Sequence, residues 1–317
     1  MDGRARRLNR ALLARQGLLE PIDEPLPETL ERIGGIQAQY APSMYIGLWS
    51  RLARFERDQL TRALEAREVI QATLMRGTIH LVSRADFWPL ALAIRGARRR
   101  LPGVKPGDEE AVRAVLAGGA MRRKELEAVT APQVHLWTDL VRVPPSGTWE
   151  RRRADLYAAA EDWIGPPPPV ADPVRHLVER YLGGFGPASR KDIASFTGLT
   201  PTQLAPALEG LVAYDDELLD LHDAPMPDPE TPAPVRLLPT WDATLLVHAR
   251  RAQILPEEHR PRIFNTKMPQ SIGTFLVDGA VAGTWRPDGT IEAFEHLSAK
   301  QRKAVDAEGR RLIAFCT

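Results

Sequence analysis

The chain has 317 residues, of which 44% are hydrophobic and 26% are charged, with a formal net charge of +1. This length favours two or three globular domains with a sizeable core, and no uninterrupted apolar run reaches the roughly 18 residues that a membrane span needs. The one cysteine, Cys316, excludes an internal disulfide, a cysteine-ligated zinc site and a four-cysteine iron–sulfur cluster. The seven histidines show no ligand spacing, so we expect neither a metal nor a cofactor.

Charge is distributed unevenly along the chain. Residues 1–100 contain 17 arginines and no lysine against 11 acidic residues, whereas residues 215–230 hold seven acidic residues and no lysine or arginine. This asymmetry permits a basic groove for phosphates beside an acidic outer surface, although any single arginine can equally lie on a solvated helix face. Because the first residues lead into charged helical sequence instead of an apolar signal segment, we expect a cytoplasmic protein with no membrane partner.

The first hundred residues combine helices with one short strand. Their periodicity predicts four helices, over residues 6–17, 27–36, 50–65 and 84–100. Alternating, β-branched sequence predicts a strand over 78–83. Helices followed by a short strand fit a winged helix, so we assign residues 1–104 to a first winged-helix module.

A second winged-helix module is expected over residues 105–170. Its predicted parts are two short helices and a wing hairpin, over 111–118, 123–130 and 136–149. The second of these helices is rich in Arg, Lys and Glu, as in helix-turn-helix units. The arginine run 151–153 is expected either to begin a surface helix or to contact phosphates.

Residues 171–233 contain the strongest helix-turn-helix pattern of the chain. Thr200 is expected to cap a helix over 201–212, with Pro201 at its favoured first position. From Pro201 to Leu211 there is no Arg or Lys to bridge guanine edges, which argues against a sequence-specific transcription factor.

The last segment, 234–317, follows a proline-rich acidic loop and is expected to be β-rich. Asp278-Gly279 predicts a hairpin turn between alternating runs, and a charged helix is expected over 300–315. Asp242 follows a tryptophan at an expected strand end. Its carboxylate could serve as a general base or, as we favour, accept hydrogen bonds from nearby backbone amides.

Two glutamines one residue apart, Gln37 and Gln39, form the strongest candidate for a reactive site. In an extended segment both amides would point the same way, and Gly34, Gly35 and Pro42 allow an irregular, loop-like backbone. An amide cannot act as a general base at neutral pH, but it can hold a water and direct carbonyl oxygens at positive charge. Such a site suits an activated substrate, for example a cationic N3- or N7-alkylated purine. The other interpretation is that both amides satisfy buried backbone groups in a bend.

Further polar candidates have two possible roles each. Arg76, Thr78 and His80 alternate along the expected strand and would share one face, which could approach the glutamines or DNA; His80 could equally be a core histidine. Arg250 and Arg251 could contact phosphates or lie on a solvated face. No Gly-x-Ser-x-Gly elbow and no Gly-x-x-x-x-Gly-Lys-Ser/Thr loop occurs, which argues against a serine hydrolase and an NTPase.

Two strings carry a resemblance to a known family: GIQAQY at 35–40 and LMRGTIHLV at 74–82. They resemble the winged-helix family that contains the AlkZ and YcaQ type alkylpurine DNA glycosylases, in the version with Gln-aliphatic-Gln. Pro-x-Trp-Asp at 239–242 and Val-Asp-Gly-x-Val-x-Gly-x-Trp at 277–285 are also similar to that family. The resemblance therefore covers almost the whole length.

This resemblance implies an α+β fold of tandem winged-helix modules around a concave basic channel, with a β-rich C-terminal part. It implies catalytic roles for Gln37 and Gln39. It also implies a DNA-probing hairpin, which we assign to 263–275 with Lys267 and Met268 near its tip; an ordinary surface hairpin is equally open there.

The implied partner is double-stranded DNA that contains alkylated or crosslinked purines. The implied reaction is hydrolysis of the N-glycosidic bond, by a monomer associated with the nucleoid. No motif places a lysine for a Schiff base, so we expect a monofunctional enzyme without a lyase step. The family also implies unhooking of crosslinked guanines, which cannot be fully flipped out of the duplex. Two alternatives remain open: a winged-helix transcription regulator and a non-catalytic damage-binding protein.

Overall fold

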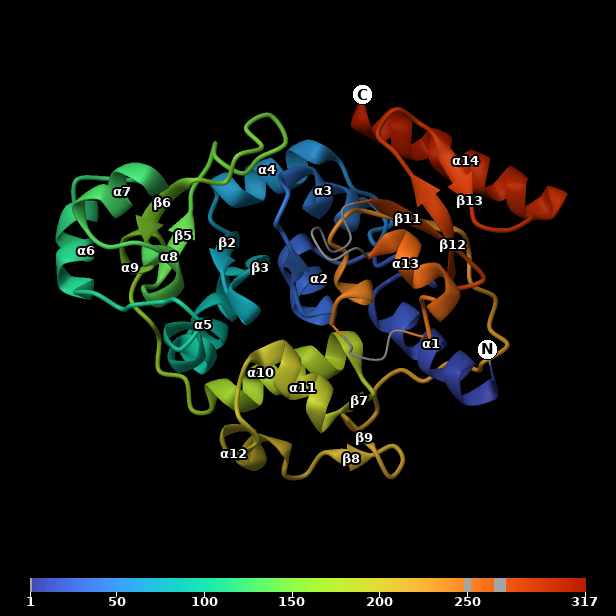
Figure 1. Cartoon of the computed structure of the whole chain (residues 1–317), viewed down its shortest axis with the longest axis horizontal. Helices are drawn as coiled ribbons and strands as arrows, with labels where there is room; N and C mark the ends of the chain where they lie inside the picture. Colours follow the sequence, from blue (N-terminus) through green and yellow to red (C-terminus); the bar gives the residue numbers. More distant parts are fainter. Residues whose placement is uncertain (1, 248–251, 265–271) are drawn as a thin grey trace.

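The computed structural model describes residues 2–247, 252–264 and 272–317, and mixes helices with three antiparallel sheets (Figure 1). The expected α+β class is confirmed. Among the described residues, no helix has the length and apolar character that a bilayer crossing requires.

The first unit begins with the N-terminal helix α1 (Gly3–Arg15) and then forms a winged helix. Its elements are α2 (Leu26–Ile33), β1 (Ile36–Gln37), α3 (Ala41–Trp49), α4 (Arg57–Glu65), β2 (Val69–Thr73) and β3 (Ile79–Ser83). The short strand β1 pairs with β3, the second strand of the hairpin that follows the helices. This order of helix, short strand, two helices and hairpin is the winged-helix topology.

One predicted helix of this unit is wrong in its bounds. The helix expected over 50–65 is replaced by α3 and α4 with a loop between them. Pro42, which we expected to keep the backbone irregular, lies in the first turn of α3, where a missing N–H leaves no hydrogen bond unmade. In the loop, Leu52 forms a bridge with Ile22, a long-range contact that local periodicity does not report.

The second unit repeats the same topology after the long helix α5 (Arg84–Arg99). Its elements are α6 (Glu109–Leu116), β4 (Met121–Arg122), α7 (Arg123–Val129), α8 (Val134–Trp137), β5 (Leu140–Arg142), β6 (Leu156–Ala159) and α9 (Ala160–Ile164). Here β4 pairs with β6, the second hairpin strand. The wing is longer than predicted, because its second strand lies beyond residue 149. The arginine run 151–153 lies in the loop between the wing strands and begins no helix.

The third unit follows α10 (Pro173–Phe185). Its elements are β7 (Ala188–Ser189), α11 (Arg190–Thr197), α12 (Pro201–Leu204), the 3₁₀ turn η2 (Ala205–Leu208), β8 (Val212–Ala213) and β9 (Leu218–Asp220). Again the short strand, β7, pairs with the second hairpin strand, β9. Thr200 caps α12 and Pro201 is its first residue, as predicted, although regular helix ends well before 212. Three repeats of one topology confirm the tandem winged-helix arrangement.

The first two units share a sheet. Strands β2 and β5 pair antiparallel, with Gln71 opposite Arg142 and Ala72 opposite Val141. The result is a six-stranded sheet in the order β1-β3-β2-β5-β6-β4. Helix α10 of the third unit packs against α1, α2 and α5. The three units therefore form one connected body; Figure 1 shows the second at one end and the third below the centre.

The C-terminal part contains a four-stranded antiparallel sheet. Its strands are β10 (Arg236–Leu238), β11 (Gly273–Val277), β12 (Ala280–Trp285) and β13 (Ile291–Ala293), and α14 (Ala299–Cys316) packs against β10. The predicted turn at Asp278-Gly279 joins β11 to β12 and contacts α1, where Asn9 Nδ2 donates to the Gly279 carbonyl at 2.8 Å. The first helix and a late hairpin thus lie side by side.

Candidate active site

Gln37 lies at the end of β1, directly opposite His80 of β3. Its side chain is buried, with 5% of its surface exposed, and its Oε1 accepts a hydrogen bond from Arg76 Nη2 at 3.1 Å. Residues directly opposite on antiparallel strands share a face, so Gln37 and His80 are neighbours on one side of the sheet. The sheet ladder and Arg76 together hold this amide in place.

Gln39 lies beyond the strand, in a bend, and its side chain is exposed. The last ladder contact before the bend is a hydrogen bond from Ala38 N to the Ile79 carbonyl, at 2.7 Å. Gln39 Oε1 then accepts from Ile79 N at 3.3 Å. The strand that carries Gln37 therefore ends before Gln39. Each amide oxygen accepts one hydrogen bond and keeps a second lone pair.

Arg76 reaches Gln37 from a left-handed turn. It lies in the 3₁₀ turn η1 (Met75–Gly77) with φ 56° and ψ 16°, and strand β3 starts only at Ile79. The prediction that Arg76, Thr78 and His80 share a strand face is therefore wrong for Arg76. Its guanidinium lies 5.1 Å from the centre of the Phe196 ring, and burial lowers the pKa of Arg76. Thr78 turns to its own loop, where Oγ1 donates to the Met75 carbonyl at 3.1 Å.

His80 is a buried neutral histidine. Its Nδ1 lies 3.1 Å from the Thr78 carbonyl, which can only accept, so Nδ1 carries the proton and Nε2 is the basic nitrogen. Burial, with the Arg76 charge as a second cause, lowers the pKa of His80 to about 3. Of its two open roles, direct contact with DNA does not fit a side chain that is 3% exposed. His80 instead packs beside the strand that carries Gln37.

Asp242 has the structural role that we favoured. Its carboxylate is buried and receives both terminal nitrogens of Arg51, at 3.0 and 2.9 Å. Thr244 also donates to it, from its backbone N–H and its hydroxyl. A carboxylate that accepts four hydrogen bonds inside an ion pair has little capacity to act as a general base.

A basic hollow of about 530 Å³ lies beside the glutamine motif, with Gln39 on its wall. Thr73 and Ile79, which pair across β2 and β3, also line it and point away from the His80 side of the sheet. Five cations and two carboxylates line the same hollow: Arg122, Arg123, Lys124, Arg142, Arg153, Glu125 and Asp155. All of these charged residues come from the second winged helix, so the hollow joins the motif of one unit to the charge of the next.

Part of the lining of this hollow was predictable from the sequence, whereas its central arginine was not. The arginine run and the Arg-Lys-Glu helix were visible as charged stretches, and they supply Arg153, Arg123 and Lys124. Arg142 gave no signal, because a single arginine in an expected wing strand is typical of a solvent-facing position. Its burial results from the β2–β5 pairing between two units, which no local pattern encodes.

Four candidate DNA-binding residues lie outside the described part of the chain: Arg250, Arg251, Lys267 and Met268. The expected DNA-probing hairpin at 263–275 falls largely outside it as well. Its described ends are Ile263, the last residue of α13 (Arg260–Ile263), and the beginning of β11. These five assignments remain predictions.

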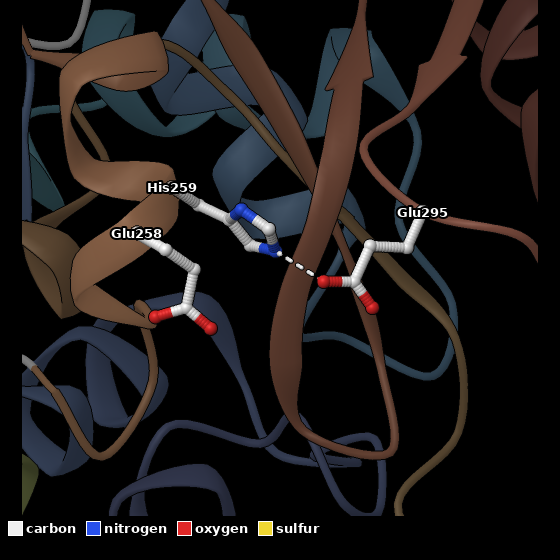
Figure 2. Close-up of side chains that lie close together, drawn as sticks. All are labelled: Glu258, His259 and Glu295. Atoms are coloured by element: carbon white, nitrogen blue, oxygen red, sulfur yellow. Dashed lines mark ion pairs between the residues drawn. The ribbon is translucent and has the colours of Figure 1, made fainter.

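One group of possible metal ligands occurs among the described residues. Glu258 and His259, from the 3₁₀ turn η4 (Glu257–His259), lie near Glu295, and the His259 ring points toward the Glu295 carboxylate (Figure 2). His259 Nε2 lies 3.7 Å from a Glu295 carboxylate oxygen, and the His259 ring packs 4.8 Å from that of Phe294. Both carboxylates are exposed, and none of the three residues lines the basic hollow. A polar contact at the surface accounts for this geometry.

The fold and the basic hollow are those of a winged-helix protein that binds nucleic acid. More specifically, the chain belongs to the AlkZ-like DNA glycosylase family, because the family model described as DNA glycosylase AlkZ-like matches residues 30–315. A solved structure, the DNA glycosylase AlkZ of Streptomyces sahachiroi, is similar with a TM-score of 0.79 and 20% identity, over 98% of this chain and 96% of that one. No curated protein sequence matches.

Proposed function

We propose that this protein is a monofunctional glycosylase that removes cationic N3- or N7-alkylated purines from double-stranded DNA and leaves an abasic site. Membership of the AlkZ-like family supports the general activity. The observation that carries the finer proposal is the glutamine motif, which is held by the β2–β3 hairpin and has Gln39 on the wall of a basic hollow. Amides are sufficient here because an alkylated purine is already a good leaving group.

In the proposed reaction, the bond from the sugar C1′ to the purine nitrogen breaks, and its electron pair moves to the purine and neutralises its positive charge. A water adds to the resulting oxocarbenium-like sugar and releases its proton to solvent. No step requires a strong base, so two amides can serve by positioning the water and stabilising charge.

The two glutamines have different surroundings, and we infer different roles. Gln39 is exposed in the hollow and has one free lone pair on Oε1, so it is the residue that would contact water and sugar. Gln37 is buried and bonded to Arg76, so it would act as a positioning residue for the motif. Gln37 lies on the His80 side of the sheet and does not line the hollow, so its effect on the site would pass through the backbone that links it to Gln39.

The test uses purified protein with two DNAs, one with a single N7-alkylguanine and one with an N7-guanine interstrand crosslink. Alkali converts abasic sites to strand breaks, which a gel resolves. We expect Gln39→Ala to slow single-turnover base release about 10²- to 10³-fold, as for loss of one stabilising group. Gln37→Ala should cost about 10- to 100-fold through misplacement.

Gln59→Ala, on α4 and away from the hollow, is the matched control and should leave the rate unchanged. Breaks in the crosslinked DNA would extend the proposal to unhooking. Binding to both DNAs without any break would overturn it.

A second candidate function is a damage-binding protein without catalysis. One observation favours it: both amide oxygens already accept a hydrogen bond from the protein, as they would in a purely structural bend. The gel separates the two candidates, because this one predicts lesion-dependent binding with no base release from wild-type protein.

A further inference from the structure

Arg142 is buried in the basic hollow and its hydrogen bonding is incomplete. The residue is 4% exposed. Its Nε donates to the Ala154 carbonyl at 3.1 Å and its Nη2 donates to the Tyr157 hydroxyl at 2.8 Å. The third nitrogen, Nη1, is shielded from solvent by the protein and has no hydrogen-bond partner. A buried donor of this kind normally has an acceptor.

The other buried arginines provide an internal comparison. In the described part of the chain, four further arginines are buried, and each forms an ion pair with an aspartate: Arg10 with Asp278, Arg15 with Asp220, Arg51 with Asp242 and Arg98 with Asp139. Arg142 has neutral partners only. Burial lowers the pKa of Arg142, and the charge of Arg123 acts in the same direction. A desolvated cation without an anion is unfavourable, so the missing partner is an anion from outside the protein.

The carboxylates of the hollow do not supply that anion. Asp155 is bound by Arg122 at 3.0 Å and by Arg153 at 2.7 Å. Glu125 accepts from the backbone N–H of Arg122 in a capping box. Within the described residues, Arg123 and Lys124 form no ion pair either, so three cations face the hollow without a carboxylate.

An anion that satisfies these groups needs several acceptor oxygens, and a phosphate has them. A guanidinium binds phosphate with charge-assisted hydrogen bonds, and Lys and Arg around it add to the attraction. The same hollow is lined by Gln39, so its occupant lies beside the proposed reaction centre. This proximity favours a phosphodiester of the DNA substrate over a free phosphate ion.

We propose that the basic hollow is a built site for one phosphodiester of the damaged DNA strand, bound by Arg142 with Arg123 and Lys124 around it. The phosphate is one that flanks the nucleotide whose base is removed. Its position relative to the lesion rests on the proposed function, whereas the phosphate site itself does not. Binding there would fix the damaged strand in register with Gln39.

The test measures binding to a duplex with one N7-methylguanine, and to copies in which a single flanking phosphate is replaced by an uncharged methylphosphonate. Arg142→Met removes the charge and keeps most of the bulk. It should weaken binding to the unmodified duplex about 10- to 100-fold, as expected for a hydrogen bond to a charged group. The slope of log binding constant against log salt concentration should become shallower by the amount expected for loss of about one phosphate contact.

The decisive result is coupling at a single position. For wild-type protein one methylphosphonate should weaken binding by a similar factor, and for Arg142→Met that same replacement should have no further effect. Arg54→Met, at an arginine that is largely exposed and paired with Asp23, is the control and should preserve the wild-type pattern. Losses that simply add at every position, or unchanged binding by Arg142→Met, would overturn the proposal.

Two further measurements distinguish a DNA phosphate site from a structural arginine and from a site for free phosphate. Thermal stability of Arg142→Met should be unchanged or raised, because a desolvated charge is removed. Arg98→Met, which removes one of the two arginines that bind the Asp139 carboxylate, should lower it. If inorganic phosphate stabilises wild-type protein while DNA binding is insensitive to Arg142→Met, the hollow takes only a free ion and the proposal fails. Binding to lesion-free duplex is measured in parallel. If the glycosylase proposal fails but the phosphate site exists, Arg142→Met should still weaken binding to the duplex although no base is released.

Discussion

Gln37 and Gln39 are close together in the motif but are held by different kinds of contact. A side-chain donor, Arg76, fixes the first amide, and a backbone donor, Ile79 N, fixes the second. The two histidines near the glutamines do not have the pKa near 7 that suits a general base. Burial lowers the pKa of His80 to about 3 and that of His135 to about 4. The role that we propose for the site residues is therefore positioning.

The low pKa of His80 makes the free energy of unfolding depend on pH. An unfolded histidine titrates near its ordinary pKa of 6.5, whereas the folded value is about 3. Between these values the unfolded chain binds one more proton, so the free energy of unfolding falls as the pH is lowered, by up to about 1.4 kcal/mol per pH unit. The stability advantage of wild type over His80→Gln should shrink accordingly from pH 7 to pH 4. Urea denaturation of both proteins at several pH values measures this, and a pH-independent difference would contradict the assignment.

At the scale of elements, the hairpin turn between β11 and β12 is fitted against α1. Gly279 has φ +80°, and a Cβ on it would lie 2.4 Å from Asn9 Oδ1 and 2.6 Å from Arg10 Nη1. Both neighbours are buried and hydrogen-bonded, so neither can yield easily. The turn therefore reverses the chain between β11 and β12 and also packs tightly against α1.

Gly279→Ala should therefore lower the free energy of unfolding by about 2–5 kcal/mol, from backbone strain plus overpacking. Gly103→Ala is the matched control, since Gly103 has φ +79° but a methyl group there would meet nothing within 4 Å. It should show the strain alone. Chemical denaturation of both variants gives the difference, and equal losses would mean that the turn does not bear on α1.

For the whole molecule, pairing of β2 with β5 and packing of α10 against α1, α2 and α5 tie the winged helices together. We propose the segments 1–104, 105–170, 171–233 and 234–317 as topological modules, not as independently folding domains. Denaturation should then be a single transition, in which far-UV circular dichroism and tryptophan fluorescence coincide. The tryptophans report on different regions, because Trp88, Trp137 and Trp285 are buried in the first, second and last segments. Separate midpoints for the two probes would contradict this.

Long-range assembly also separates what could be predicted from sequence from what could not. The helix start at Thr200 and the turn at Asp278 were predictable because caps and hairpin turns depend on a few adjacent residues. The family resemblance led to Gln37 and Gln39. The left-handed Arg76 was not predictable, since no glycine marks that position, and Arg142 became a buried cation only through pairing between two units. Local patterns thus identified the modules and the motif, whereas the hollow depends on contacts between units.

The contact between α1 and the β11–β12 hairpin also has a consequence during synthesis. Arg10 is fully buried in the finished protein, and besides Asn9 of the same helix its acceptors are the Thr231 carbonyl and Asp278. At translation rates of about 5–20 residues per second, the 268 residues that separate Arg10 from Asp278 take roughly 13–54 s to be made. Throughout that interval the first helix carries a cation whose final partner has not yet left the ribosome. Helix α1 can therefore reach its native environment only after the turn between β11 and β12 has been made.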